Sequence, residues 1–416
     1  MCARLNTDAI AAEIGNQSWN VQISTEKVTQ MLLNLKSGKS AGYDDLSPRI
    51  LREAYDILAA PLTHLFTVSI AAQKFPTAWK MAMIAPIPKK KNPSLNDFRP
   101  ISLLSIPSKL LETLVLNSVR QRLLLHYGDY QFGFRPGAST LHANVTIHDF
   151  VTRHLDKSSM KGVVMIAMDL SKAFDKLSHE SLMRSLIGLS FPRDFLLWIS
   201  DFLLNHKQRV LLQGTVSTNV TNVTSGVPQG SVLAPYLFAF HMGTLSPAQP
   251  ETLLVKYADD VSILIPFSEN SDLSSLVLTE IENIKKWSSS HGLQVNEEKT
   301  KSLVFTKSEI TELKLRSVPN LNSDLKILGV TFENTLKWDK HMENITKCAS
   351  RRIHALRMLK RIPGATQKDL IPVYQNYILS IIEYNSPLFV GLGSRNELGT
   401  SCETLPPHHL RSKLSM

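Results

Sequence analysis

Two adjacent acids, Asp259 and Asp260, interrupt the apolar stretch LLVKYADDVSILI at residues 253–265. Two strand-like runs joined by two residues predict a hairpin. The usual connector is Asn-Gly or Asp-Gly, because both central positions need a positive φ, and this makes Asp-Asp a costly connector. Neighbouring carboxylates between apolar runs repel each other and lose hydration, so they require a proton or a bound cation. Taken alone, the pair is also compatible with an exposed acidic turn on an edge hairpin.

A third acid, Asp169, lies at the end of the apolar run VVMIAMDL, where a solvated surface acid is less expected than a functional one. Three carboxylates at strand ends could converge on Mg²⁺, which takes oxygen ligands and completes its shell with substrate phosphates. Two such ions about 3.5 to 4 Å apart stabilise the attacking and leaving oxygens in phosphoryl transfer. The three acids therefore predict a two-metal site.

The charge balance agrees with such chemistry. The chain has 416 residues, and Lys plus Arg minus Asp plus Glu is 46 − 36 = +10. This excess favours a polyanionic partner such as nucleic acid or an anionic membrane, although solubility alone can also require a charged surface. A hydrophobic content of 43% argues against disorder, and no stretch reaches the roughly 18 apolar residues of a membrane span.

Cysteine usage and the N-terminus bear on the cellular compartment. Cys2, Cys348 and Cys402 are odd in number and far apart, so they predict neither a disulfide framework nor a zinc site. The first residues lack the basic and apolar regions of a secretory signal. We therefore expect an intracellular protein of the nucleus or cytoplasm that is not secreted.

The N-terminal elements that would support the site are helices followed by a β-ribbon. Residues 1–79 predict two amphipathic segments separated by the turn SGKSAGYDD at 37–45. That turn is either a plain loop or a basic contact for a nucleic-acid phosphate. From Trp79 onward, a short apolar run, the lysines 89–91 and the turn-forming NPSLNDFRP predict a β-ribbon with a basic tip.

The remaining elements mix helices and strands without a regular strand-helix-strand alternation, which disfavours a doubly wound parallel sheet and predicts an α+β fold. Predicted helices cover 101–126, 141–155, 178–189 and 231–245, and predicted strands or hairpins cover 163–170, 209–226 and 253–265.

Seven motifs, taken together and in order, resemble those of reverse transcriptases from non-LTR (LINE-type) retrotransposons. The fingers motifs are PIPKKKNPSLNDFRPISLLSIPSKLLE at 86–112 and QFGFRPGAST at 131–140. The palm motifs are DLSKAFD at 169–175, SGVPQGSVLAP at 225–235, YADD at 257–260, GLQVNEEKT at 292–300 and LKILGVTF at 325–332.

The resemblance implies RNA-directed DNA synthesis, with an RNA template, a DNA primer and deoxynucleoside triphosphates as partners. It makes Asp169 and Asp259 the main metal ligands and lets Asp260 complete the acidic cluster. Two Mg²⁺ ions, with Mn²⁺ as a substitute, are the implied cofactors. Phe174 corresponds to a bulky position that excludes a 2′-hydroxyl, although it could also be a core residue, and Asp175 is expected to be a hydrogen-bonding or helix-start acid.

The resemblance also implies residues that hold the nucleotide. Arg99 and Lys89 correspond to fingers cations that clamp the triphosphate, although lysine runs are usually solvated surface. Gln229 lies at the apex of a Gly-Pro turn and can hydrogen-bond template or nucleotide, and Ser231 is a candidate N-cap for the following helix. Lys299 corresponds to a general acid for the leaving pyrophosphate, or is an exposed turn lysine.

Basic residues outside the palm are expected to contact nucleic acid. We place Arg135 of the fingers in this group, together with Arg351 and Arg352 of the basic segment 337–362. That segment carries eight Lys or Arg against two acids. It suits an amphipathic helix that tracks a phosphate backbone, and a membrane-surface helix is the competing interpretation.

The resemblance implies a right-hand polymerase with fingers, a palm built on an antiparallel sheet, and a helical thumb. The expected divisions are a helical extension at 1–69, the reverse transcriptase domain at 70–332, a basic thumb at 333–393 and a divergent tail at 394–416. No endonuclease, zinc knuckle or ribonuclease H pattern is recognised, so a fragment or degenerate copy of a longer element is expected. An inactive nucleic-acid-binding remnant and an RNA-making polymerase are the alternatives, and the oligomeric state is not predicted.

Overall fold

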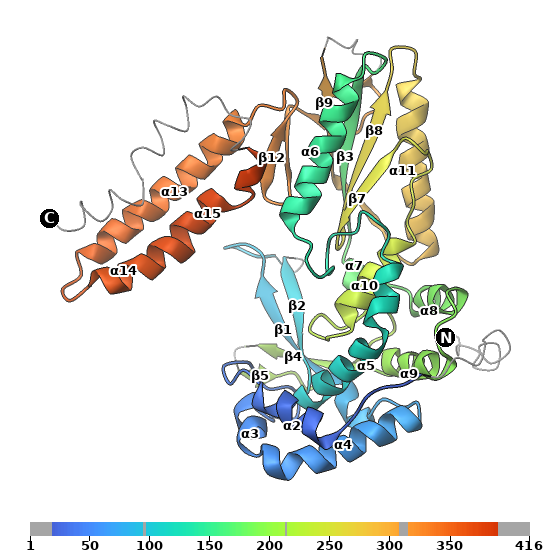
Figure 1. Ribbon diagram of the computed structural model, residues 1–416, viewed down its shortest axis with the longest axis vertical. Coiled ribbons are helices and arrows are strands. Elements are labelled where there is room, and N and C mark those ends of the chain that lie inside the picture. Colours follow the sequence, from blue (N-terminus) through green and yellow to red (C-terminus); the bar gives the residue numbers. More distant parts are fainter. Residues whose placement is uncertain (1–18, 95–96, 213, 308–314, 390–416) are drawn as a thin grey trace. The chain divides into compact units, whose positions relative to one another are not determined.

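The chain folds into two compact units. The computed structural model describes residues 19–94, 97–212, 214–307 and 315–389 (Figure 1). The first unit contains 1–136, 169–246 and 281–296, and the second contains 137–168, 247–280 and 297–416. The predicted divisions at 69, 332 and 393 do not coincide with these units and stay predictions, and the predicted tail lies outside the described residues.

Serine caps fix the starts of α2 and α3, the first two helices that the structure describes in the first unit. The side chain of Ser24 accepts a hydrogen bond from Lys27 N at the start of α2, and Ser47 does the same for Ile50 N ahead of Pro48 in α3. Such caps satisfy backbone donors that have no partner within the helix. The three helices are α2 (Thr25–Leu33), α3 (Pro48–Glu53) and α4 (Tyr55–Ala71).

The predicted turn at 37–45 is a loop, and it packs against Ser105, which lies two residues after the end of β2. A Cβ on Gly42 would lie 2.4 Å from Ser105 N, so only glycine fits this approach. The Ser105 hydroxyl donates to Asp44 Oδ2 at 2.6 Å. The loop interpretation is therefore confirmed, while a phosphate contact at this turn stays a prediction.

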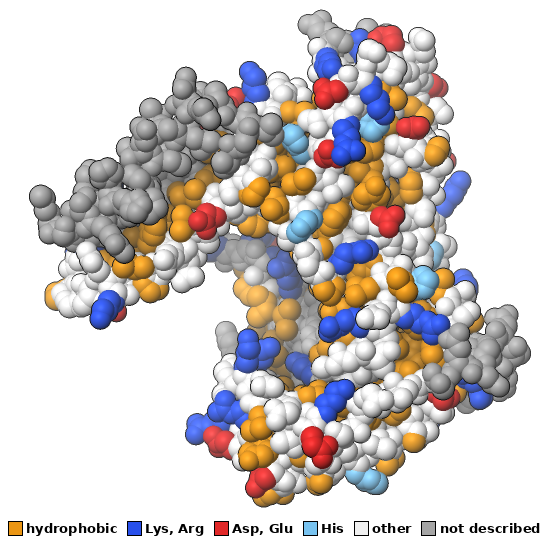
Figure 2. Space-filling model, in the orientation of Figure 1, with side chains coloured by type: hydrophobic (Ala, Val, Ile, Leu, Met, Phe, Trp, Pro, Cys, Tyr) orange, Lys and Arg blue, Asp and Glu red, His pale blue; other side chains and the backbone are white. Residues whose placement is uncertain are grey.

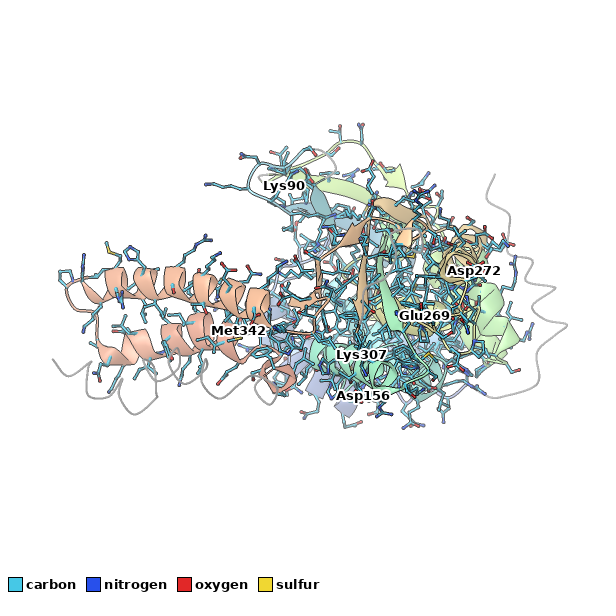
Figure 3. The ribbon with its side chains drawn as sticks, turned by 90° about the horizontal axis from the view of Figure 1, so that it is seen from above. Lys90, Asp156, Glu269, Asp272, Lys307 and Met342 are labelled. Carbon is cyan, nitrogen blue, oxygen red and sulfur yellow. The ribbon has the colours of Figure 1, made fainter. Side chains whose placement is uncertain are left out.

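The predicted β-ribbon is also present. β1 (Met81–Pro88) and β2 (Phe98–Leu103) pair antiparallel from Met83↔Leu103 to Pro88↔Phe98. Lys90, labelled in Figure 3, lies just beyond the end of β1 and forms an ion pair with Asp97 at 2.8 Å. Asp97 also accepts from Ser94 N and Ser94 Oγ, so this acid closes the basic tip.

The other elements of the first unit extend the sheet and cover it. β4 pairs parallel with β1, and both β5 and β6 pair antiparallel with β4. These elements are η1 (Thr77–Lys80), α5 (Ile106–Leu125), α7 (Ala173–Lys176), α8 (His179–Gly188), α9 (Arg193–Leu203), β4 (Lys207–Leu212), β5 (Thr215–Val216), β6 (Thr221–Asn222) and α10 (Ala234–Gly243). The hairpin predicted at 209–226 and the buried helix predicted at 231–245 are confirmed.

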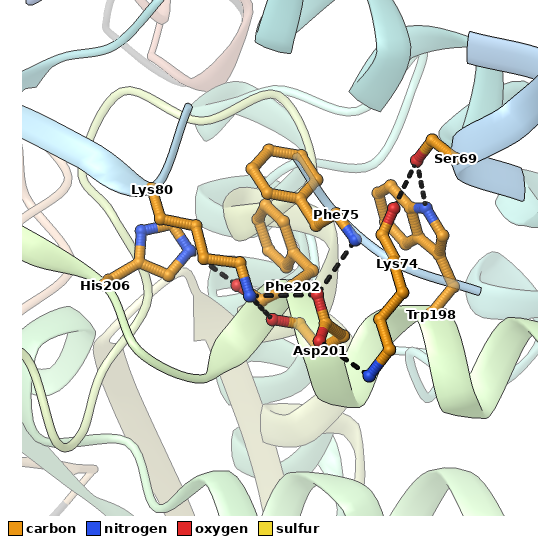
Figure 4. A network of polar contacts seen from close by, with 8 residues as sticks. All are labelled: Ser69, Lys74, Phe75, Lys80, Trp198, Asp201, Phe202 and His206. Carbon is orange, nitrogen blue, oxygen red and sulfur yellow. Dashed lines mark hydrogen bonds and ion pairs between the residues drawn. The ribbon is translucent and has the colours of Figure 1, made fainter. Parts of the chain in front are cut away.

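A buried polar network ties the segment after α4 to α9 (Figure 4). Lys80 is only 5% exposed and donates to Asp201 Oδ2 at 2.9 Å and to the Asp201 carbonyl. The backbone N–H of Phe75 donates to the same carboxylate at 2.9 Å. Trp198 donates to Ser69 Oγ at 3.1 Å. A buried charge requires such pairing, and here it fixes two segments that are distant in the sequence.

Two buried histidines in this unit make its stability depend on pH. His206 and His241 are 4% and 0% exposed. Burial lowers the pKa of His206 from 6.5 to about 4 and that of His241 from 6.5 to about 3, with the neighbouring His291 adding to the second shift. Both rings are therefore neutral in the fold at neutral pH.

We expect the free energy of unfolding to fall as the pH drops from about 6.5 towards about 4. The lowered pKa of each histidine gives stability that is complete above the unfolded value and is lost as the unfolded chain takes up protons. Each histidine contributes a slope of up to about 1.4 kcal/mol per pH unit. Urea unfolding at several pH values measures the slope. In the His241→Phe variant, the slope of the unfolding free energy with pH should be smaller by the contribution of one histidine. An unchanged slope in that variant would contradict the role given to His241.

The second unit is built on a five-stranded sheet with the order β10-β9-β3-β8-β7. β3 is almost wholly buried along its length, as expected for the central strand. The strands are β3 (Gly162–Leu170), β7 (Leu253–Tyr257), β8 (Asp260–Phe267), β9 (Val295–Thr306) and β10 (Leu321–Asn322). β3 and β9 each extend by two residues into the first unit. Helix α6 (Thr140–Asp156) packs on β7 and β8, and α11 (Leu273–Ser290) is shared between the units.

A small hairpin and a helical segment complete the second unit. β11 (Asp324–Ile327) and β12 (Val330–Glu333) pair around Leu328 and Gly329, which both have a positive φ. The Tyr384 hydroxyl lies 2.8 Å from both the Leu328 carbonyl and Thr140 Oγ1, which links this turn to α6. The helices are α13 (Asp339–Lys360), α14 (Gln367–Val373), η2 (Tyr374–Leu379), α15 (Ser380–Glu383) and η3 (Ser386–Leu388). Across the described ranges, every helix is too short or too polar to cross a membrane.

Candidate nucleotidyl-transfer site

The acidic turn lies between β7 and β8, but its connector differs from the prediction. Tyr257 pairs with Asp260, so the two connecting residues are Ala258 and Asp259 rather than the two acids. The positive φ of 57° belongs to Ala258. The hairpin is confirmed and the Asp-Asp connector is wrong, because β7 ends and β8 begins one residue earlier than the sequence pattern indicated. The two acids thus differ: Asp259 is half-buried in the turn, and Asp260 is an exposed strand residue.

Asp169 is the second-last residue of β3 and is half-buried. β3 is the neighbour of β8 in the sheet. Lys161 N, just before β3, donates to the carbonyl of Phe267 at the end of β8, at 2.9 Å. The two strands therefore run antiparallel, and the end of β3 points to the edge where β8 begins.

Within the part of the chain that the structure describes, no three Asp, Glu, His or Cys side chains are gathered as a metal ion requires. The predicted convergence of three carboxylates is thus not seen. The alternation of side chains along a strand gives a reason, because neighbouring residues such as Asp259 and Asp260 tend to point to opposite faces. Asp169 and Asp259 stay the predicted pair of ligands.

The loop at 225–231 is built into the first unit by close backbone contacts. Gly226 and Gly230 have positive φ values of 81° and 152°. A Cβ on Gly226 would lie 2.5 Å from the Phe174 carbonyl, and one on Gly230 would lie 2.2 Å from the Ser102 carbonyl. Only glycine fits these approaches, so the loop is held against β2 on one side and α7 on the other.

Gln229, at the apex of this loop, is anchored through both its backbone and its side chain. Its carbonyl accepts from Ser102 N at 2.8 Å. Its amide Nε2 donates to Asp175 Oδ1 at 2.8 Å. The predicted role of Asp175 as a hydrogen-bonding acid is therefore confirmed. Burial raises the pKa of Asp175, against the opposing effects of the Gln229 bond and the charges of Lys172 and Lys89.

Phe174 lies beside this anchor and has both aromatic contacts and an exposed portion. Its ring stacks on Phe238 with centroids 4.2 Å apart, and it meets the edge of Phe134 at 6.0 Å. Phe238 is fully buried, whereas Phe174 is half-buried. The ring is therefore packed firmly on one side, so its position is fixed while part of its surface remains accessible.

The predicted fingers cations lie on the β-ribbon of the same unit. Arg99 in β2 is exposed and pairs with Ile87 of β1. Arg99 lies three residues before Ser102, whose N–H donates to the Gln229 carbonyl. Lys89 is exposed and near enough to lower the pKa of Asp175. The structure thus brings Phe174 and Gln229 together beside Asp175, with Lys89 and Arg99 on the β-ribbon of the same unit.

Ser231 is not the N-cap of the following helix as predicted, although its side chain bonds to the start of that helix. Helix α10 begins at Ala234, and its N-cap residue is Leu233. Ser231 Oγ accepts from the backbone N–H groups of Leu233 and Ala234, each at 3.1 Å. The serine therefore satisfies the helix start from two residues before the cap. Its own hydroxyl donates to Glu112, a buried acid that our sequence analysis missed and that an acid inside the apolar run KLLETLVL could have indicated.

The remaining predicted site residues are spread over other elements. Lys299 is exposed on β9. Arg135 donates to the carbonyls of Gly128 and Gln131, so its guanidinium supports its own loop. In α13, Arg351 is exposed, whereas Arg352 stacks over the Tyr377 ring with its Cζ 4.1 Å from the centroid. Lys and Arg side chains lie among acidic and apolar ones on the face in Figure 2.

Comparison with known proteins places residues 87–332, more than half of the chain, in the family described as reverse transcriptase (RNA-dependent DNA polymerase). A probable RNA-directed DNA polymerase from transposon BS of Drosophila melanogaster is 29% identical over 386 residues. That alignment covers 87% of this chain and 41% of the relative.

An RNA-directed DNA polymerase from the mobile element jockey of Drosophila melanogaster is 28% identical over 400 residues, which are 90% of this chain and 42% of the relative. The chain thus spans less than half the length of these relatives. Among solved structures, an apo telomerase from Candida tropicalis, truncated from its C-terminal domain, aligns with a TM-score of 0.43 and 17% identity over 68% of this chain and 60% of that one.

Proposed function

The chain belongs to the reverse transcriptase (RNA-dependent DNA polymerase) family, and on that premise we propose that it copies RNA into DNA. It would add deoxynucleotides to a primer 3′-hydroxyl. The resemblance to non-LTR retrotransposon enzymes is confirmed by the family match and the mobile-element relatives. An intracellular location, in the nucleus or cytoplasm, stays part of the proposal.

One edge of the second unit's sheet carries this proposal. Lys161 and Phe267 are hydrogen-bonded across the antiparallel strands β3 and β8. Asp169 lies eight residues after Lys161, and Asp259 lies eight residues before Phe267. Both acids are half-buried at strand ends, and carboxylate oxygens are the ligands that a hard divalent cation takes.

The residues of this edge fit a hard divalent cation, which members of this family generally use. Asp169 and Asp259 offer carboxylate oxygens, and Asp260 adds negative charge beside them. Substrate phosphates supply the further oxygens that Mg²⁺ takes. Two bound Mg²⁺ ions, or Mn²⁺ in their place, would activate the primer hydroxyl and neutralise charge on the leaving phosphates.

In this proposal the first unit binds the incoming nucleotide. Arg99 and Lys89 supply positive charge for the triphosphate. Gln229 is oriented by Asp175, so its position is set before substrate arrives. Lys299 would donate a proton to the pyrophosphate. Arg135, Arg351 and Arg352 would contact nucleic acid, and the basic helix α13 suits a thumb that follows the phosphate backbone.

The test is primer extension by the purified chain, with a DNA primer on an RNA template and Mg²⁺ or Mn²⁺. We expect deoxynucleotide incorporation that stops when the divalent ions are chelated. Duplex binding without any extension would instead support the alternative of an inactive nucleic-acid-binding remnant. Equal incorporation of ribonucleotides would support an RNA-making polymerase.

Replacing Phe174 by valine should weaken the preference for deoxynucleotides. The smaller side chain leaves room for a 2′-hydroxyl, so the ratio of kcat/KM for deoxynucleotides over ribonucleotides should fall about tenfold or more. Single-nucleotide incorporation with each substrate measures the ratio. The variant Phe238→Leu removes part of the stacked partner and serves as a core control. If both variants lower stability and leave the ratio unchanged, Phe174 is a core residue.

A further inference from the structure

Glu112 is an acid buried in the apolar core of the first unit. It lies on α5, is 0% exposed and is surrounded on its own helix by buried leucines and valines. Burial raises its pKa, and the hydrogen bonds that it accepts act in the opposite direction. An acid in such a position is costly unless its oxygens are fully bonded, so its retention calls for a specific role.

The carboxylate is fully bonded, and three of its four donors come from one segment. Oε2 accepts from Val232 N at 2.7 Å, from Leu233 N at 3.2 Å and from the Ser231 hydroxyl. Oε1 accepts from Ser108 Oγ at 2.9 Å, one turn earlier on α5. Oε2 therefore accepts only from residues 231–233, which closely follow Gln229, and Oε1 accepts from a residue of its own helix.

The loop that contains Gln229 is also held at and before its apex. Ser102 N of β2 binds the Gln229 carbonyl at 2.8 Å, and the Phe174 carbonyl accepts from Val227 N at 2.7 Å. Glu112 binds the segment that follows the apex, at Ser231, Val232 and Leu233. Without Glu112, Val232 N would lose its acceptor in an apolar environment and Leu233 N would keep only Ser231 Oγ. The apex would then depend on its contacts with Ser102, Phe174 and Asp175.

We propose that Glu112 is a positioning residue that fixes the Gln229 loop for nucleotide addition. It does not touch substrate and acts through Ser231, Val232 and Leu233. This role rests on the proposed function, since it assigns to Glu112 the geometry of a predicted nucleotide-binding residue. A purely structural acid would instead stabilise the whole unit evenly.

The substitution Glu112→Gln separates these two roles. The amide keeps the shape and one acceptor oxygen, but its NH₂ group cannot accept a hydrogen bond. With the amide oxygen facing the loop, the NH₂ group can donate to Ser108 Oγ, but the bonds from Ser231, Val232 and Leu233 then go to a neutral oxygen and are weaker than bonds to a carboxylate. The matched control is Glu180→Gln, an exposed acid on α8 that pairs with Arg184 at 2.6 Å. Ser108→Ala is a second control, because it removes only the bond to Oε1.

Amide hydrogen exchange gives a readout that does not depend on activity. In Glu112→Gln we expect exchange at Val232 and Leu233 to rise about tenfold or more. Exchange in β1 should be unchanged, as should exchange in both controls. In primer extension, the KM for deoxynucleotides should rise about tenfold while the Kd for template and primer stays within about twofold.

Exchange that rises evenly through the first unit, or that stays unchanged at Val232 and Leu233, overturns the positioning role. If Glu112→Gln does not fold, Ser231→Ala removes one donor with less disturbance and should raise exchange at Leu233 and Ala234. If wild-type protein does not extend a primer but Glu112→Gln still loosens the loop, the polymerase proposal fails and the loop anchor stands.

Discussion

Replacing Asp259 by asparagine should lower primer extension by about 10³-fold or more, because a neutral amide cannot hold divalent cations as a carboxylate does. Asp169→Asn should have an effect of similar size. Asp260→Asn should cost less, because Asp260 is an exposed strand residue whereas Asp259 lies half-buried in the turn. Single-turnover incorporation with Mg²⁺ measures the rate, and a gel-shift assay measures duplex binding alongside it.

The matched control is Asp156→Asn, an exposed acid at the end of α6 in the same unit (Figure 3). It should extend the primer at the wild-type rate. The Kd for the duplex should stay within about twofold of the wild-type value for every variant, since these acids are expected to act in the chemical step rather than in duplex binding. Equal loss in Asp259→Asn and Asp156→Asn would contradict the assignment, because charge alone would then explain the effect.

Replacing Asp201 by alanine should lower the free energy of unfolding by about 3 kcal/mol, since it leaves the buried ammonium of Lys80 without its carboxylate. The side chain of Lys80 is 6% exposed and that of Asp201 is 20% exposed. The Phe75 N–H loses its acceptor in the same variant. Urea unfolding at neutral pH measures the change.

The exposed pair Arg49–Glu53 is the control for this network. Arg49 Nε lies 2.9 Å from Glu53 Oε1, and the two side chains are 71% and 59% exposed. Glu53→Ala should therefore lower the free energy of unfolding by less than about 1 kcal/mol. Burial by itself would raise the pKa of Asp201, but bonds from Lys80, Phe75 N and Lys74 outweigh it and hold the pKa below its ordinary value of 3.8. The stabilisation is therefore complete above pH 3.8 and is lost as the pH falls below it. A cost for Asp201→Ala as small as that for Glu53→Ala would contradict the network's role.

Local patterns predicted the elements of the fold well. The alternation of apolar residues and turn residues identified the β1–β2 ribbon, the central strand β3 and the β7–β8 hairpin, because these signals lie within a few residues of each other. The connector at Ala258 was missed by one position, since the extent of a ladder depends on pairing that no single strand contains.

The anchors of the site were not visible in the same way. Glu112 and Ser231 are 119 residues apart, and Gln229 and Asp175 are 54 residues apart, so neither pair follows from periodicity. The acids Asp169 and Asp259 were predicted because each interrupts or ends an apolar run, and the resemblance to a known family then made them the main predicted ligands. The loop that holds Gln229 required the tertiary structure, which shows what the buried acid binds.

The central claim is that an RNA strand directs which deoxynucleotide is added. Four RNA templates that differ only at the first copied base, each annealed to the same DNA primer, test this by single-nucleotide incorporation with Mg²⁺. We expect each template to direct addition of its complementary deoxynucleotide, and we expect Asp259→Asn to add none. Addition that ignores the template base, or no addition by wild-type protein that binds the duplex, would contradict it.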